Sequence, residues 1–276
     1  MNNFLIFTNT DKDLGLELSN KITEYLISKG GTATIVRDCI EDSDSEKNSF
    51  LDGVQAVIVL GGDGTMLRAA RAIGEYDIPL IGINLGTLGF LTEVEESNVF
   101  QALDRLLNDS YIIENRIMIE GIIDGKSFHS LNDIVITRAG FSRVIGLNVY
   151  VNGQLLDTYE ADGVIVATPT GSTGYNLSAG GPIISPKSKV IVVTPISPHS
   201  LTSKSVVFDS LDEIKIEIIK KRKTQDTEAI VSFDGENSIG LGAGDIVTAR
   251  TSSRTLRLIK MYDVNFYSVL RDKIGG

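Results

Sequence analysis

The stretch Ala56-Val57-Ile58-Val59-Leu60-Gly61-Gly62-Asp63-Gly64-Thr65 decides the fold class of this chain. Its first five residues are continuously apolar, as expected of a strand that is buried on both faces of a parallel sheet. Three glycines and a carboxylate follow at once, and an apolar stripe at helical spacing runs from Met66 to Ile73. The segment therefore predicts a strand, a tight turn and a helix, which is the repeating unit of α/β domains.

Short apolar runs on either side of this segment extend the pattern. Asn3–Phe7, Thr32–Val36 and Leu80–Ile83 predict three more strands. Helices are predicted from the stripe Leu14, Leu18, Ile22, Tyr25 and Leu26, and at Asn98–Leu107. The acidic, serine-rich stretch Asp38–Asn48 is predicted to be a solvated loop, because it carries little apolar surface to bury. Residues 1–108 are therefore predicted to form a Rossmann-like, three-layer α/β domain.

Beyond residue 108 the hydrophobic pattern changes from a period near 3.6 to a period of 2. Asp124-Gly125 and Asn152-Gly153 lie between β-prone runs and predict hairpins, and Ile214–Ile219 alternates like a half-exposed strand. We therefore predict an all-β sandwich domain over residues 109–261. Apolar residues recur at helical spacing in the tail, so residues 262–276 are predicted to form a helix that packs back on the first domain.

Composition excludes several classes of protein. The 276 residues carry 36 acidic and 26 basic side chains, a formal charge of -10, which disfavours nucleic-acid binding. No apolar run approaches the roughly 18 residues that would span a membrane, and the N-terminal run predicts a strand rather than a signal peptide. One cysteine and two histidines cannot form an internal disulfide or an ordinary zinc site. The expected compartment is the cytoplasm.

The glycine-rich turn Gly61–Thr65 is the first candidate for chemistry. Its glycines let the backbone approach a ligand closely, and the helix that follows presents unpaired N–H groups to an anion. A carboxylate among glycines at the carboxyl edge of a parallel sheet lies where α/β proteins bind ligands. We therefore interpret this turn as a binding loop rather than as a simple helix cap.

Three further polar segments stand out, and only one of them points to binding by itself. Asp162–Pro182 passes from an apolar strand into a loop of hydroxyls, glycines and amides with one aromatic ring, which suits a nucleotide ligand. Asn132-Asp133 and Ser232–Glu236 are local patterns that turns explain equally well. The chain has no complete Walker A motif, no Gly-x-Gly-x-x-Gly and no Gly-x-Ser-x-Gly, so a hydride-transferring Rossmann enzyme and a serine hydrolase are poorly supported.

Taken in order, four segments resemble the bacterial NAD kinase family: Gly61–Thr65, Asn84–Leu91, Leu131-Asn132-Asp133 and Thr168-Pro169-Thr170-Gly171-Ser172-Thr173-Gly174-Tyr175. The GGDGT loop alone also occurs in 6-phosphofructokinases and in diacylglycerol or sphingosine kinases. The resemblance implies an N-terminal α/β domain, a C-terminal β-sandwich, and ATP-dependent transfer of phosphate to the 2′-hydroxyl of the adenosine ribose of NAD, giving NADP.

The resemblance also implies roles for individual residues. Asp63 matches the general base, and Gly61, Gly62 and Thr65 match the loop that holds the phosphates of ATP. Mg²⁺ is expected to accompany ATP, with phosphate and water as its main ligands and without a permanent protein site. Tyr175 matches a ring that stacks on the nucleotide, and Asp234 matches a carboxylate near the catalytic centre. The remaining contacts with the dinucleotide are expected from Gly64, Arg68, Phe90, Asn132, Asp133, Arg143, Asp162, Thr170, Thr173, Gly174, Asn176 and Ser178.

The chain departs from the family pattern at Gly174, where many relatives have Ala, at Glu160, where many have Arg, and at Glu236, which is often Gln. The resemblance further implies a homo-oligomer, dimer or tetramer, and leaves open whether polyphosphate replaces ATP. Two alternative functions remain at this point. A lipid kinase would share the GGDGT loop, and a non-catalytic dinucleotide sensor would share the binding loops.

Overall fold

The computed structural model describes residues 1–38, 50–87, 89–140, 144–200, 202–220, 229–261 and 266–274. The chain divides into two compact units, one formed by Met1–Asn115 with Leu256–Gly276 and the other by Arg116–Thr255. These boundaries fall seven residues after the predicted one at 108 and six residues before the one at 261. Nearly all of the predicted loop Asp38–Asn48, and the predicted contact Arg143, lie outside the described residues.

The first unit is built on a parallel sheet. Its strands are β1 (Asn3–Thr8), β2 (Thr32–Arg37), β3 (Ala56–Gly61) and β4 (Leu80–Asn84), paired in the order β4-β3-β1-β2. β5 (Val94–Glu95) and the end of β17 (Ile246–Lys260) also pair with β4 in parallel. Because the strands are parallel, their carboxyl ends and the loops that follow them lie at one edge of the sheet.

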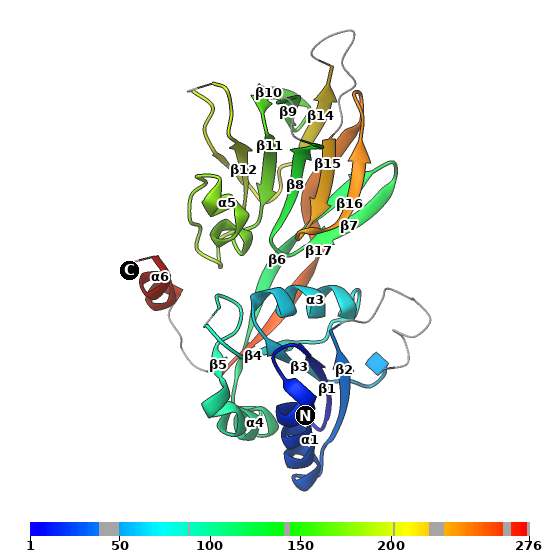
Figure 1. Cartoon of the computed structure of the whole chain (residues 1–276), viewed down its shortest axis with the longest axis vertical. Helices are drawn as coiled ribbons and strands as arrows, with labels where there is room; N and C mark the ends of the chain where they lie inside the picture. The colour runs from blue at the N-terminus through cyan, green and yellow to red at the C-terminus, as the bar shows by residue number, and fades with distance from the viewer. Residues whose placement is uncertain are drawn as a thin grey trace. The chain divides into compact units, whose positions relative to one another are not determined.

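Helices cover both faces of this sheet, as Figure 1 shows. α1 (Glu17–Ser28) and α4 (Val99–Leu107) bury Ile22, Leu26 and Leu103 in the same core as Phe4 and Ile58. α3 (Asp63–Ile73) lies on the opposite side of the sheet. The predicted three-layer α/β fold is confirmed, and the elements described in it follow the order β1, α1, β2, β3, α3, β4.

Two details of the helices differ from the predicted ones. Leu14 is 72% exposed rather than part of the apolar stripe, because Gly15 and Leu16 have positive φ and α1 begins only at Glu17. A short 3-10 turn, Leu14–Leu16, precedes it, and another, Glu96–Asn98, precedes α4.

The C-terminal helix α6 (Phe266–Ile274) belongs to the first unit, where the Phe266 ring contacts the ring of Phe90.

The second unit consists of antiparallel sheets. One sheet has the order β13 (Val206–Asp209), β12 (Val190–Ile196), β11 (Gly163–Ala167), β8 (Asp133–Arg138), β15 (Ala229–Phe233) and β16 (Glu236–Leu241). The other contains β10 (Gln154–Ala161), β9 (Ile145–Val151), β14 (Ile214–Ile219) and β17, with β6 (Ile112–Ile123) pairing with β17 and with β7 (Lys126–Ser130). Residues of both sheets, including Ile134, Val164, Leu147 and Ile216, share one core, so the predicted β-sandwich is confirmed.

The hairpins form where the sequence predicts them. Asp124 and Gly125 have φ of 49° and 75°, and Asn152 and Gly153 have φ of 50° and 80°. Two consecutive residues with positive φ give the turn whose twist matches that of the flanking strands. Within the described ranges, no helix is both long enough and apolar enough to span a membrane.

Candidate functional site

Asp63 joins two loops at the carboxyl edge of the parallel sheet. It is the first residue of α3, directly after the turn that ends β3. Its Oδ2 accepts a hydrogen bond from the N–H of Phe90 at 2.8 Å, and its Oδ1 accepts one from the N–H of Leu91 at 3.0 Å. Each carboxylate oxygen can accept a further bond, and the side chain is only partly buried. The carboxylate is therefore held in place and still accessible.

Glycines make this arrangement possible. A Cβ on Gly89 would overlap Oδ1 of Asp63 and come within 2.7 Å of Oγ1 of Thr92. A Cβ on Gly61 would overlap Oγ1 of Thr65. The space that these two glycines leave is filled by the protein's own side chains, those of Asp63 and Thr65.

Other side chains surround the start of α3. Thr65 is buried, and its Oγ1 accepts a bond from Nδ2 of Asn9 at 3.4 Å. The predicted dinucleotide contact Arg68 forms an ion pair with Asp38, with 2.6 Å between Nη2 and Oδ2. Gly64, also predicted, is exposed.

Lys12 was not predicted from the sequence. Its Nζ lies 3.5 Å from the position that a Cβ would take on Gly62, and 3.6 Å from the corresponding position on Gly86. The signal available was the place of this lysine in the loop after β1, at the edge of the sheet where ligands bind. An ammonium group beside two glycine loops and the positive end of α3 suits an anion.

Phe90 contributes through its backbone. Its ring packs on α6, with the ring of Phe266 at 5.9 Å and Nζ of Lys273 at 4.9 Å from the ring centre. The interaction with Asp63 is made by the amide of Phe90. The predicted pocket-lining role for this aromatic ring therefore has no support in these contacts.

In the second unit, Asp234 holds the segment Leu131–Asp133. Its carboxylate accepts hydrogen bonds from the N–H groups of Leu131 at 2.8 Å, Asn132 at 2.7 Å and Asp133 at 3.2 Å. The N–H of Asp234 donates to the carbonyl of Asp133 at 3.1 Å. Asp234 and Gly235, with φ of 50° and 77°, form the predicted hairpin turn between β15 and β16. The turn therefore carries a carboxylate that anchors the start of β8.

A cavity of about 470 Å³ opens at this place, lined by Asn132, Asp133, Val135, Thr137, Tyr175, Ser232, Asp234 and Gly235. It brings together four predicted residues, Asn132, Asp133, Tyr175 and Asp234. Tyr175 is 45% exposed, and a ring that stacks on a ligand must be accessible. The cavity thus combines a free aromatic face with amide and carboxylate groups.

Burial changes the acidity of Asp133. Its side chain is only 6% exposed, and desolvation together with the nearby charge of Asp234 raises its pKa to about 7. A carboxyl group in such surroundings exchanges its proton near neutral pH, and an ionised one accepts hydrogen bonds from ligand hydroxyls.

The other predicted residues of the second unit do not line this cavity. Asp162 forms an ion pair with Arg138, with 2.7 Å between Oδ1 and Nε. Thr170 is buried and accepts a bond from Nη1 of Arg116, and Thr173 donates to the carbonyl of Thr170. These side chains shape the loops around β11. Gly174 precedes the short helix α5 (Tyr175–Ser178), and Ser178, the last residue of this helix, is exposed.

Asn176 has an internal role. Its side chain is fully buried, its Nδ2 donates to the carbonyls of Ser172 and Pro182, and its Oδ1 accepts a bond from Oγ1 of Thr194 at 2.7 Å. A Cβ on Gly181 would overlap this amide. All the polar atoms of the Asn176 side chain are therefore engaged in fixing the loop.

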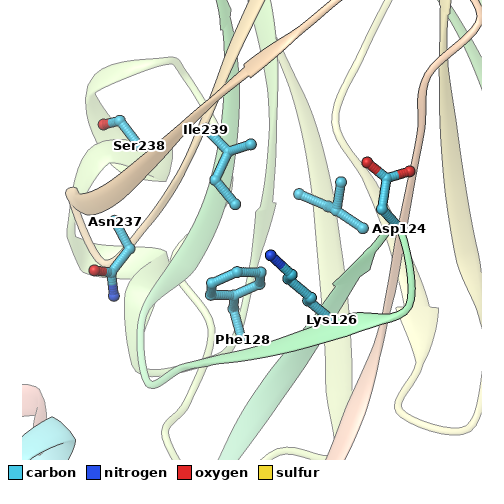
Figure 2. A pocket seen from close by; sticks show the side chains of 7 residues that line it. Asp124, Lys126, Phe128, Asn237, Ser238 and Ile239 are labelled. Atoms are coloured by element: carbon cyan, nitrogen blue, oxygen red, sulfur yellow. The ribbon is translucent and has the colours of Figure 1, made fainter.

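A second cavity of about 420 Å³ lies beside the β6–β7 hairpin. Figure 2 shows Lys126 and Phe128 of this hairpin facing Ile239, with Asn237 and Ser238 at the rim. None of the predicted site residues lines it. Among the residues that the structure describes, no group of three or more His, Cys, Asp or Glu side chains is placed to hold a metal ion.

Comparisons with known proteins agree with these features. A family model described as the ATP-NAD kinase N-terminal domain matches residues 4–111, and one described as the ATP-NAD kinase C-terminal domain matches residues 131–261. An NAD kinase of Agathobacter rectalis is 47% identical over 100% of this chain and 99% of its own length. An NAD kinase of Lachnoclostridium phytofermentans is 43% identical with the same coverage.

Solved structures share the fold. A yeast NADH kinase complexed with NADH superposes with a TM-score of 0.85 at 22% identity, covering 100% of this chain and 88% of the yeast chain. An NAD kinase from Archaeoglobus fulgidus in complex with ATP gives a TM-score of 0.80 at 24% identity, covering 99% and 98%.

The two-unit fold, the glycine-rich loop with its carboxylate and the family matches define a phosphotransferase enzyme of the kinase class. The chain belongs to the ATP-NAD kinase family, and its activity is the phosphorylation of NAD by ATP. The lipid-kinase and sensor alternatives are therefore set aside.

Proposed function

We propose that Asp63 is the general base of this NAD kinase and accepts the proton of the 2′-hydroxyl of the adenosine ribose. The observation that carries this proposal is the fixed and accessible carboxylate, held by the amides of Phe90 and Leu91. A ribose hydroxyl is a weak nucleophile at neutral pH, so a positioned acceptor lowers the barrier as the bond to phosphorus forms.

The loop around Asp63 would bind the phosphates of ATP. Gly61 and Gly62 lead from β3 into α3, and Thr65 lies in the first turn of this helix, where N–H groups favour an anion. Magnesium would enter with ATP and neutralise the charge on the phosphates. A loop with one carboxylate among glycines fits a metal held mainly by phosphate and water.

Asn132, Asp133 and Tyr175 would bind the dinucleotide. The amide and carboxyl group face the same cavity as the exposed ring, which allows hydrogen bonds to a ribose or carboxamide and stacking on a base. The family resemblance further proposes contacts from Gly64, Arg68, Phe90, Arg143, Asp162, Thr170, Thr173, Gly174, Asn176 and Ser178.

The substitution Asp63→Asn tests the base. We expect turnover, measured as NADP formed from NAD, ATP and Mg²⁺ with a coupled NADP-specific dehydrogenase, to fall by several orders of magnitude. NAD binding by isothermal calorimetry should remain within about threefold of the unsubstituted chain. Near-normal turnover of this variant would remove Asp63 from the role of base, whereas loss of NAD binding would make it a binding residue.

Three further proposals concern the oligomeric state, the compartment and the phosphate donor. We propose a homo-oligomer, dimer or tetramer, that acts in the cytoplasm, with ATP as donor and polyphosphate as a second donor to be tested. The support is the resemblance to the family. Sedimentation of a fully active species at about 30 kDa would contradict the oligomer.

A further inference from the structure

We propose that Thr168 is a positioning residue for NAD. Its hydroxyl fixes the relative position of two walls of the cavity, the segment with Asn132 and Asp133 and the loop with Tyr175. The inference rests on the proposed role of Asn132 and Asp133 as dinucleotide contacts. Thr168 does not line the cavity, and its side chain is fully buried.

The backbone of Leu131–Asp133 has all six of its polar groups paired with just two residues. The three N–H groups donate to the carboxylate of Asp234, and the carbonyl of Asp133 accepts from the N–H of Asp234. The carbonyl of Leu131 accepts from Oγ1 of Thr168 at 2.6 Å, and the carbonyl of Asn132 accepts from the N–H of Thr168 at 2.8 Å. Asp234 thus anchors the N–H groups and Thr168 anchors the other two carbonyls.

These hydrogen bonds hold residues that the regular strand pairing of the sheet does not include. β8 begins at Asp133, whose partner on β11 is Ala167, so Leu131 and Asn132 precede the regular strand. Thr168 continues β11 by one residue and adds a side-chain hydroxyl to the pairing. The position of the Asn132 side chain therefore depends on Thr168 and Asp234.

The same hydroxyl reaches the opposite wall. Oγ1 of Thr168 accepts a hydrogen bond from the N–H of Gly171 at 3.1 Å. Gly171 opens the turn that leads through Gly174 to Tyr175, and a Cβ on Gly171 would overlap the carbonyl of Asn132. One buried oxygen thus links the strand that carries Asn132 and Asp133 to the loop that carries Tyr175.

Removing the hydroxyl oxygen of Thr168 should displace the residues around the cavity and leave the residues that carry the chemistry in place. Valine has the shape of threonine without the hydroxyl, so it leaves the carbonyl of Leu131 and the N–H of Gly171 without this partner. A side chain displaced by a fraction of an ångström loses hydrogen bonds to its ligand. The affinity for NAD should fall, while Asp63 and the phosphate loop, which belong to the other unit, are unchanged.

The test compares Thr168→Val with Thr168→Ser in steady-state kinetics on the full chain. We expect the valine variant to raise KM for NAD about tenfold, with KM for ATP within about twofold, since one buried hydrogen bond to a backbone group is at stake. Serine keeps the hydroxyl and should restore KM for NAD to within about threefold. If the valine variant does not fold, Thr168→Ala carries the same prediction.

Thr251→Val is a matched control, because Oγ1 of Thr251 also donates to a backbone carbonyl, that of Ser210, away from the cavity. It should lower thermal stability without changing KM for NAD. An unchanged KM in the valine and alanine variants at Thr168, or an equal rise in valine and serine variants, would overturn the inference.

Asn132→Ala separates this inference from the function on which it rests. A raised KM for NAD in Asn132→Ala with an unchanged KM in Thr168→Val would leave the dinucleotide contact standing and remove only the positioning role. Unchanged KM values in both Asn132→Ala and Asp133→Asn would remove the dinucleotide contact and the positioning role together, because Thr168 would then position no group that binds NAD.

Discussion

The Asp63 carboxylate occupies the space that a side chain on Gly89 would need. Both carboxylate oxygens accept backbone N–H groups from the residues directly after Gly89, and a Cβ at Gly89 would overlap Oδ1 of Asp63. The carboxylate of the proposed base can therefore take this position only if residue 89 has no side chain.

Gly89→Ala should displace the Asp63 carboxylate. We expect kcat to fall by about 100-fold, since a misplacement of about 1 Å costs an enzyme this much. The measurement is steady-state NADP formation. Gly240→Ala is the control, because a Cβ at Gly240 meets no atom within 4 Å. Equal kcat in both variants would show that the carboxylate does not need the space at residue 89.

Lys12→Ala should weaken ATP binding. The ammonium group lies beside Gly62 and Gly86, and within the described part of the chain no hydrogen bond or ion pair engages its Nζ. We expect KM for ATP to rise about tenfold with KM for NAD unchanged, since a charge-assisted bond to phosphate is lost.

Lys21→Ala, an exposed position on α1, is the matched control for this loss of charge. Lys12→Arg should recover most of the affinity because the charge is kept. A KM for ATP that is equal in the Lys12→Ala and Lys21→Ala variants would place the phosphates elsewhere.

NAD binding should depend on pH through Asp133. Its pKa is about 7, so the carboxyl group is protonated below that pH and ionised above it. Hydrogen bonds from a ribose hydroxyl to an ionised carboxylate are stronger than those to a neutral acid. We expect KM for NAD to fall as pH rises from 6 to 8, and Asp133→Asn to flatten this dependence. Identical pH profiles for the two proteins would contradict the assignment.

Asp133 should also make folding stability pH-dependent. Its pKa is raised from 3.8 to about 7, so between these values the folded state binds more protons than the unfolded state. The protonated carboxyl group of Asp133 makes its whole contribution to the free energy of unfolding below about pH 4, and this contribution is lost as pH rises toward about 7. In urea titrations, the free energy of unfolding of Asp133→Asn should rise relative to that of the unsubstituted chain as pH rises over this interval, by at most about 4 kcal/mol. A constant difference would refute the linkage.

Much of the architecture could be predicted from local patterns. The buried run Ala56–Leu60, the amphipathic spacing from Met66 to Ile73 and the Asp-Gly and Asn-Gly turns specify elements within about a dozen residues, where periodicity and backbone preference decide the outcome. Leu14 was misassigned because the apolar spacing continued across a backbone kink at Gly15 and Leu16. The GGDGT segment was likewise recognisable as the turn that leads from β3 into α3.

The candidate site was predictable only as a set of segments. The sequence by itself determined which elements form, in which order, and which loops carry polar groups, because these depend on neighbours along the chain. Only the tertiary structure decided that the Asp63 carboxylate meets the amides of Phe90 and Leu91, that Asp234 anchors residues about 100 positions earlier, and that Asn176 faces inward. The physical reason is that such contacts arise when strands distant in sequence pair in a particular register, and no local preference encodes that register.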